Sequence, residues 1–117
     1  MTRLAQLDLD EQKGITIASV DGEIDLSNAA ELEVAISHAV GNEALGLVVD
    51  LVHVDYLDSS GVTLLFNLAR RLARRQQEFV VVVPGEAHIR EILSLSGAAE
   101  ALALQESVAD ALAKLRR

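Results

Sequence analysis

The 117-residue sequence contains no cysteine and no tryptophan, and its only aromatic residues are two phenylalanines and one tyrosine. Without thiols, the chain can form neither disulfides nor thiolate metal sites, and thiol catalysis is excluded. Because aromatic rings are so scarce, the core must consist of Leu, Ile, Val and Ala. No apolar stretch approaches the ~20 residues of a membrane span. The first residues, Met1 to Gln6, lack the apolar region of a signal peptide. We therefore expect a cytoplasmic protein with no direct membrane insertion.

Positive charge is also scarce, since 10 Lys and Arg residues face 18 Asp and Glu residues and the net charge is −8. Nucleic acids and anionic membranes are bound through surplus Lys and Arg, so we expect neither as a partner. A local basic cluster does occur, at Arg70, Arg71, Arg74 and Arg75. Cations at the end of a helix complement its dipole, which is the simplest interpretation of this cluster.

Metal ligands are dispersed in the sequence. The histidines, His38, His53 and His88, lie far apart without metal-ligand spacing. Glycine-rich nucleotide-binding patterns are also absent. We therefore expect no metal and no cofactor.

What the sequence does contain is a regular alternation of apolar patterns. Half of its residues are hydrophobic, and its length fits one domain, residues 1–117. Period-2 and compact apolar runs predict strands, and stripes with helical spacing predict helices. The expected strands are 3–9, 15–20, 45–52, 79–83 and a short edge strand at 102–104, and the expected helices are about 28–40, 61–75, 86–95 and one after Ser107. This order predicts an α/β fold, with a mixed, mostly parallel sheet of four to five strands and about four helices.

The segment after the central strand is the best candidate for a functional site. Residues 45–52 form a nearly continuous apolar run, which suits a strand covered on both faces. Residues 54–62 are then expected to form the loop that leads into the next helix. Open α/β sheets present functional groups at this position, and the helix N-terminus favours an anion. This loop contains Asp58-Ser59-Ser60-Gly61.

Two interpretations of this tetrapeptide remain open on spacing alone: it is a helix cap with no other role, or it is a functional site. Asp58, Ser59 or Ser60 could simply cap the helix. One cap needs only one such residue, however, and three stand in a row. A hydrolase using Ser59, His53 and either Asp55 or Asp58 is a further hypothesis. We disfavour it, because the sequence has no Gly-x-Ser-x-Gly elbow and no recognisable oxyanion hole, and we expect no enzymatic activity.

Four segments in register resemble one family. Val48-Val49-Asp50-Leu51, followed by Tyr56-Leu57-Asp58-Ser59-Ser60-Gly61, is similar to the signature of STAS domains, specifically bacterial anti-sigma factor antagonists. Gly22-Glu23-Ile24-Asp25 resembles the family motif after the second strand, and Ile92 to Gly97 resembles the end of its third helix. The resemblance covers essentially the whole chain.

The resemblance implies a mechanism. Members of this family bind an anti-sigma factor that is also a GHKL-type serine kinase, which frees the sigma factor. The kinase phosphorylates a serine of the antagonist, which then dissociates, and a PP2C-like phosphatase resets it. By position the phosphorylated serine is Ser59, and Ser60 becomes the helix cap or a local hydrogen-bonding partner. The implied partner-binding residues are Glu23, Asp25, Asn28, Asp58, Ser59, Ser60 and Gly61.

A second member of the same family is an alternative. Some STAS domains are non-switching scaffolds in stress-signalling assemblies or accompany lipid transporters. The intact Asp58-Ser59 pair favours the switching antagonist, because a scaffold needs no phosphorylatable residue there.

Overall fold

A five-stranded sheet forms the centre of the molecule. The computed structural model describes residues 5–115. The strands are β1 (Gln6–Gln12), β2 (Ile15–Ile24), β3 (Gly46–Leu57), β4 (Glu78–Val82) and β5 (Leu104–Gln105), in the spatial order β1-β2-β3-β4-β5. β1 pairs antiparallel with β2, and the three other pairings are parallel. The prediction of a mixed, mostly parallel sheet is confirmed.

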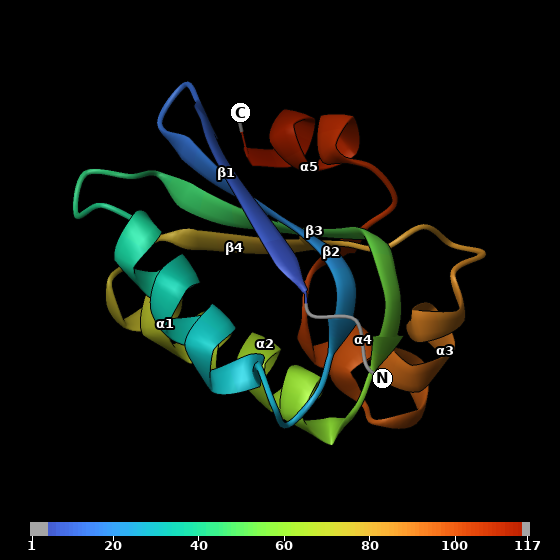
Figure 1. The fold of residues 1–117 in the computed structure, drawn as a ribbon. Coiled ribbons are helices and arrows are strands. Elements are labelled where there is room, and N and C mark those ends of the chain that lie inside the picture. The colour runs from blue at the N-terminus through green and yellow to red at the C-terminus, as the bar shows by residue number, and fades with distance from the viewer. Residues whose placement is uncertain (1–4, 116–117) are drawn as a thin grey trace.

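The helices lie on both faces of this sheet. They are α1 (Ala29–Ala39), α2 (Ser59–Arg74), α3 (His88–Leu95), the one-turn α4 (Ala98–Ala101) and α5 (Val108–Leu115). Each parallel crossover steps to the next strand in the same direction, so right-handed crossovers place α1 to α4 on one face. The last helix, α5, covers the opposite face (Figure 1). About four helices were expected, and the additional one-turn α4 was not predicted.

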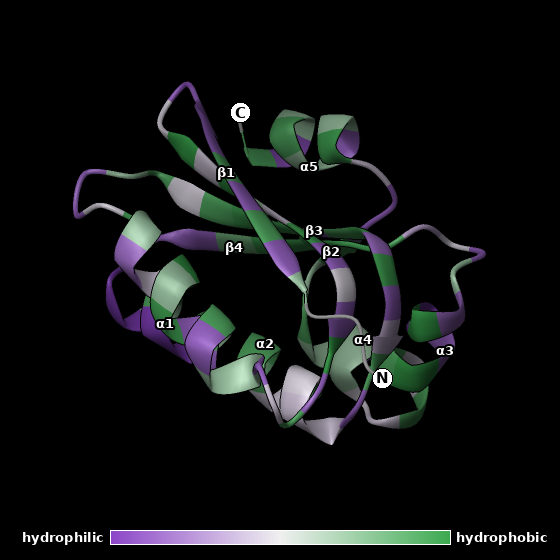
Figure 2. Cartoon of the chain, viewed as in Figure 1, coloured by the Kyte–Doolittle hydropathy of each residue, from purple (hydrophilic) through white to green (hydrophobic). Residues whose placement is uncertain are grey.

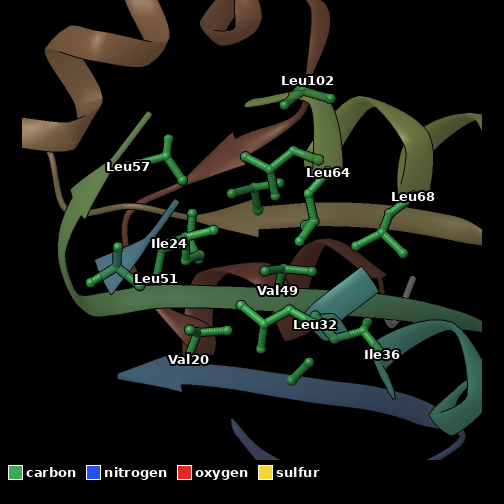
Figure 3. Close-up of a cluster of buried hydrophobic side chains, with 14 of the residues drawn as sticks. Val20, Ile24, Leu32, Ile36, Val49, Leu51, Leu57, Leu64, Leu68 and Leu102 are labelled. Carbon is green, nitrogen blue, oxygen red and sulfur yellow. The ribbon is translucent and has the colours of Figure 1, made fainter. Parts of the chain in front are cut away.

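The core divides into two layers because β3 is covered on both sides. Leu47, Val49 and Leu51 belong to the large apolar cluster beneath α1 to α4, and Val48 belongs to the smaller cluster under α5. Figure 2 shows that the central strands are rich in hydrophobic residues, and Figure 3 shows part of the larger cluster. The nearly continuous apolar run at residues 45–52 therefore belongs to a strand that is covered on both faces, as predicted.

The first strand is less buried than its alternation predicts. In a strand with period 2, Leu7 and Leu9 share one face, but Leu7 is half-buried whereas Leu9 is 50% exposed. β1 is an edge strand of the sheet. A residue on an edge strand lies at the margin of the helical layer, where fewer side chains cover it.

The central strand is longer than predicted, and this places the site. β3 continues to Leu57, and beyond Asp50 it pairs with β2 alone. The β2–β3 pairing contains two register shifts, and Gly22 adopts a φ of 120° between them. Such irregularities bend a strand pair. The two strands accordingly curve away from the sheet and end where α2 begins (Figure 1).

Candidate partner-binding site at the start of α2

The first turn of α2 is capped by Asp58. Its side-chain oxygen Oδ1 accepts hydrogen bonds from the backbone N–H groups of Ser60, at 2.8 Å, and Gly61, at 3.3 Å. Of the two roles expected of Ser60, the cap belongs to Asp58 instead, and Ser60 is a local hydrogen-bonding partner through its backbone N–H. Asp58 has the extended backbone of a cap residue, and a carboxylate at this position also complements the helix dipole. The expected loop 54–62 is reduced to this single residue between β3 and α2.

Gly61 allows α2 to start directly on the ends of the two strands. A Cβ atom at this position would lie 2.3 Å from Cδ1 of Leu57 and 3.2 Å from Cγ2 of Ile24. Both side chains are buried in the core and appear together in Figure 3. Gly61 is itself buried, so its role is to permit close packing rather than to contact a partner.

Asn28 holds the neighbouring loop in place. Its Oδ1 accepts a hydrogen bond from the N–H of Asp25, at 3.0 Å, and its Nδ2 donates to the carbonyl oxygen of Glu23, at 2.8 Å. Asn28 and Glu31 have the spacing of a capping box, but this box does not form, because the Asn28 side chain bonds to the preceding loop instead. Asn28 is buried, so it positions Glu23 and Asp25 and presents little surface of its own.

These elements surround an open acidic hollow. It has a volume of about 720 Å³ and is lined by Glu23, Asp25, Leu26, Ser27, Tyr56 and Asp58. The end of β2 supplies Glu23, which is in register with Tyr56 of β3. The hydrogen bond from Asp58 N–H to the carbonyl of Ile24, at 3.2 Å, fastens the start of α2 to the end of β2. Carboxylates from two distant stretches of sequence therefore face one hollow.

Ser59 and Ser60 have different surroundings. Ser59 is the first residue of α2 and is exposed. Ser60 is half-buried and lines a separate groove of about 280 Å³ between α1 and α2. Leu26 borders both the hollow and this groove, so the two form one continuous surface. Of the two hydroxyl groups, that of Ser59 is more accessible to a second protein.

Comparison with known proteins agrees with this architecture. The family model of the STAS domain matches residues 6–111. The chain belongs to the STAS domain family. It is 34% identical over 106 residues to the anti-sigma-F factor antagonist RsfB of Mycobacterium tuberculosis, an alignment that covers 91% of this chain and 85% of RsfB. The crystal structure of an anti-sigma factor antagonist from Mycobacterium paratuberculosis superposes with a TM-score of 0.87 at 32% identity, covering 97% of this chain and 96% of that one.

The acidic hollow includes two exposed side chains that the sequence analysis did not assign to the site. Leu26 is 81% exposed and Tyr56 is 44% exposed, and both line the acidic hollow. Leu26 does not stand out in the sequence, because it reads as the end of a strand, and Tyr56 lies in the segment that resembles the family signature without having been assigned to the contact surface. A large apolar side chain exposed within a polar rim is typical of a surface that binds another protein.

The positions of His53 and Ser59 give no support to the hydrolase hypothesis. His53 lies on β3 opposite Asp21, four residues before the strand ends at Leu57, which is about 13 Å along the strand. A general base must lie within about 3 Å of the nucleophile that it activates. Within residues 5–115, no hydrogen bond joins His53 to Ser59.

Residues 5–115 contain no group of three or more His, Cys, Asp or Glu side chains that could hold a metal ion. Among the helices of the described part of the chain, none is long and apolar enough to cross a membrane.

Proposed function

We propose that this protein is an anti-sigma factor antagonist, which binds an anti-sigma factor serine kinase through the acidic hollow and is switched off by phosphorylation of Ser59. The observation that carries this proposal is that Ser59 is exposed and directly follows Asp58, one of the three acidic residues, with Glu23 and Asp25, that line the hollow. The similarity to RsfB and to the mycobacterial antagonist of known structure supports it. Such a protein acts by binding and is not an enzyme, and its place of action is the cytoplasm.

The proposed contact surface consists of the exposed part of the site. Leu26 and Tyr56 are the apolar anchors, since apolar and aromatic groups at the centre of an interface contribute most of its binding energy. Around them lie the acidic and polar side chains of Glu23, Asp25, Asp58, Ser59 and Ser60. Asn28 and Gly61, which the sequence also placed in this surface, act by positioning it.

Phosphorylation of Ser59 weakens binding because it adds negative charge to the contact surface. The kinase transfers the γ-phosphoryl group of ATP to Oγ of Ser59, ADP leaves, and the hydroxyl proton is released. The phosphoserine adds about −1.5 to −2 charges next to Asp58, which with Glu23 and Asp25 lines the hollow that the partner covers. Desolvating this added charge costs several kcal/mol of binding free energy, which corresponds to a loss of affinity of about 10²-fold or more. A PP2C-like phosphatase then restores the binding form by hydrolysing the phosphate ester.

The test is phosphorylation by the anti-sigma factors of the same genome. Each is purified and mixed with this protein and ATP, and the phosphorylated residue is mapped by mass spectrometry. We expect one phosphate, on Ser59. The Ser59→Ala variant should bind the partner and resist release, whereas Ser60→Ala should still be phosphorylated and released.

The outcome also separates the alternatives. Phosphate on Ser60 alone would show that the wrong serine has been assigned. Binding without phosphorylation of either serine would favour the non-switching scaffold. Failure to bind any of these anti-sigma factors would overturn the proposed function itself.

A further inference from the structure

The basic cluster at the end of α2 has no role in the site described above. Arg70, Arg71, Arg74 and Arg75 supply four of the ten cationic side chains of a chain whose net charge is −8. Complementing the helix dipole accounts for one or two cations in the last turn. The others repel one another, because like charges three or four residues apart on a helix are neighbours. The cluster is therefore larger than the stability of α2 requires.

The four guanidinium groups differ in what they contact. Arg75 donates a hydrogen bond to Oδ1 of Asn42, at 2.7 Å, and Arg70 donates to the side chain of Asn67. Arg71 and Arg74 are exposed. Neither makes a hydrogen bond or an ion pair with any residue that the structure describes. These two arginines are thus available to a partner.

Arg71 and Arg74 lie on the same face of α2 as Ser60, which belongs to the proposed contact surface. Positions 60, 63, 67, 71 and 74 are spaced by three or four residues, so they form one stripe along a helix. Ser60, Thr63 and Asn67 line the groove between α1 and α2, and the stripe continues from them to the two arginines. At about 1.5 Å per residue, it extends about 21 Å from Ser60 to Arg74.

We propose that Arg71 and Arg74 bind an acidic surface of the same anti-sigma factor that docks at Ser59. The inference rests on the proposed function. A typical interface buries about 800 Å² on each partner, which is wide enough to include both ends of this stripe. The contact surface then carries opposite charges at its two ends. Phosphorylation acts at the acidic end, and the basic end fixes the orientation of the partner. DNA or an anionic membrane is a poorer occupant, because the remainder of the chain repels both.

The test compares two double variants that change the net charge equally. R71E/R74E reverses the charge of the free arginines, and K13E/K114E reverses two lysines elsewhere on the molecule. Binding to the anti-sigma factor that binds the parent protein is measured over a range of salt concentrations. We expect Kd to rise about tenfold for R71E/R74E at low salt, mainly through slower association, and to approach the parent value at about 0.5 M salt. K13E/K114E should change Kd less than about twofold.

A third variant separates binding from helix stability. R71Q/R74Q removes the charges without reversing them, and we expect an unchanged melting temperature with a raised Kd. If the melting temperature of R71Q/R74Q falls together with its affinity, or if R71E/R74E binds like the parent at every salt concentration, the inference is wrong while the proposed function stands. A parent protein that binds no anti-sigma factor overturns both. Loss of binding to a DNA duplex or to phosphatidylserine vesicles, with partner binding unchanged, would assign the arginines to a different occupant.

Discussion

Asp58 combines two tasks in one side chain. Its carboxylate caps α2 through the N–H groups of Ser60 and Gly61, and it also contributes negative charge to the hollow beside Ser59. Capping requires an acceptor oxygen, which the amide of asparagine also has, whereas the charge requires the ionised acid. The two tasks can therefore be separated by substitution.

We expect Asp58→Asn to retain the stability of the parent within a few tenths of a kcal/mol and to change partner affinity. Asp58→Ala should lose the cap as well, which costs about 1 kcal/mol of unfolding free energy. Urea unfolding of the three proteins, followed by circular dichroism, measures the first effect, and titration with the anti-sigma factor measures the second. If the asparagine and alanine variants unfold alike, Asp58 does not stabilise α2 as a cap.

At the scale of elements, the junction between β3 and α2 depends on close packing at Gly61. A methyl group there would overlap Leu57, whose side chain is fixed in the core. Gly41 offers a matched comparison, since a Cβ at that position would meet no atom within 4 Å.

We therefore expect Gly61→Ala to lower the unfolding free energy by about 1–3 kcal/mol, because the core must shift to admit the methyl group. Gly41→Ala should be neutral or slightly stabilising, since alanine restricts the unfolded chain more than glycine does. Thermal unfolding decides this, because 1 kcal/mol moves the melting temperature of a domain of this size by about 4–8 °C. Equal melting temperatures for the two variants would contradict the packing role of Gly61.

The elements themselves were largely predictable from periodicity, but the joints between them were not. The order of strands and helices follows from apolar runs such as residues 47–51, which report burial directly. The continuation of β3 to Leu57 depends on pairing with β2, a non-local contact that no local pattern shows. The spacing of Asn28 and Glu31 also suits a capping box, and spacing alone does not reveal that the Asn28 side chain bonds back to Glu23 and Asp25 instead. In the site, the resemblance indicated the carboxylates and serines, while the exposure of Leu26 and Tyr56 depends on tertiary structure.

At the scale of the whole molecule, the switch should change the surface and leave the fold intact. Ser59 is exposed at the start of α2, where the helix dipole favours negative charge. The N–H groups of Ser60 and Gly61 are already bonded to Asp58, however, so an added phosphate gains few hydrogen bonds and is repelled by that carboxylate. The two effects oppose each other.

A Ser59→Asp variant should therefore melt within a few degrees of the parent and lose affinity for the kinase. Two-dimensional NMR of the phosphorylated protein should show shifted amide signals around the start of α2 and unchanged signals in α5, on the opposite face of the sheet. Shifts that extend to residues 108–115, or a melting temperature more than about 8 °C lower, would indicate a conformational rather than a surface mechanism.

The spatial order β1-β2-β3-β4-β5 is also the order in which a ribosome makes these strands. Each new strand can join the edge that the previous strand has just formed, so no strand has to insert between two others. Each pairing therefore closes as soon as its second strand is made, which allows assembly to begin during synthesis. The helix α5 follows all five strands in the chain. Until it is made, the apolar side chains on its face of the sheet lack the cover that α5 gives them, so this face of the nascent sheet exposes Ile15, Ile17, Val48, Val80 and Val82.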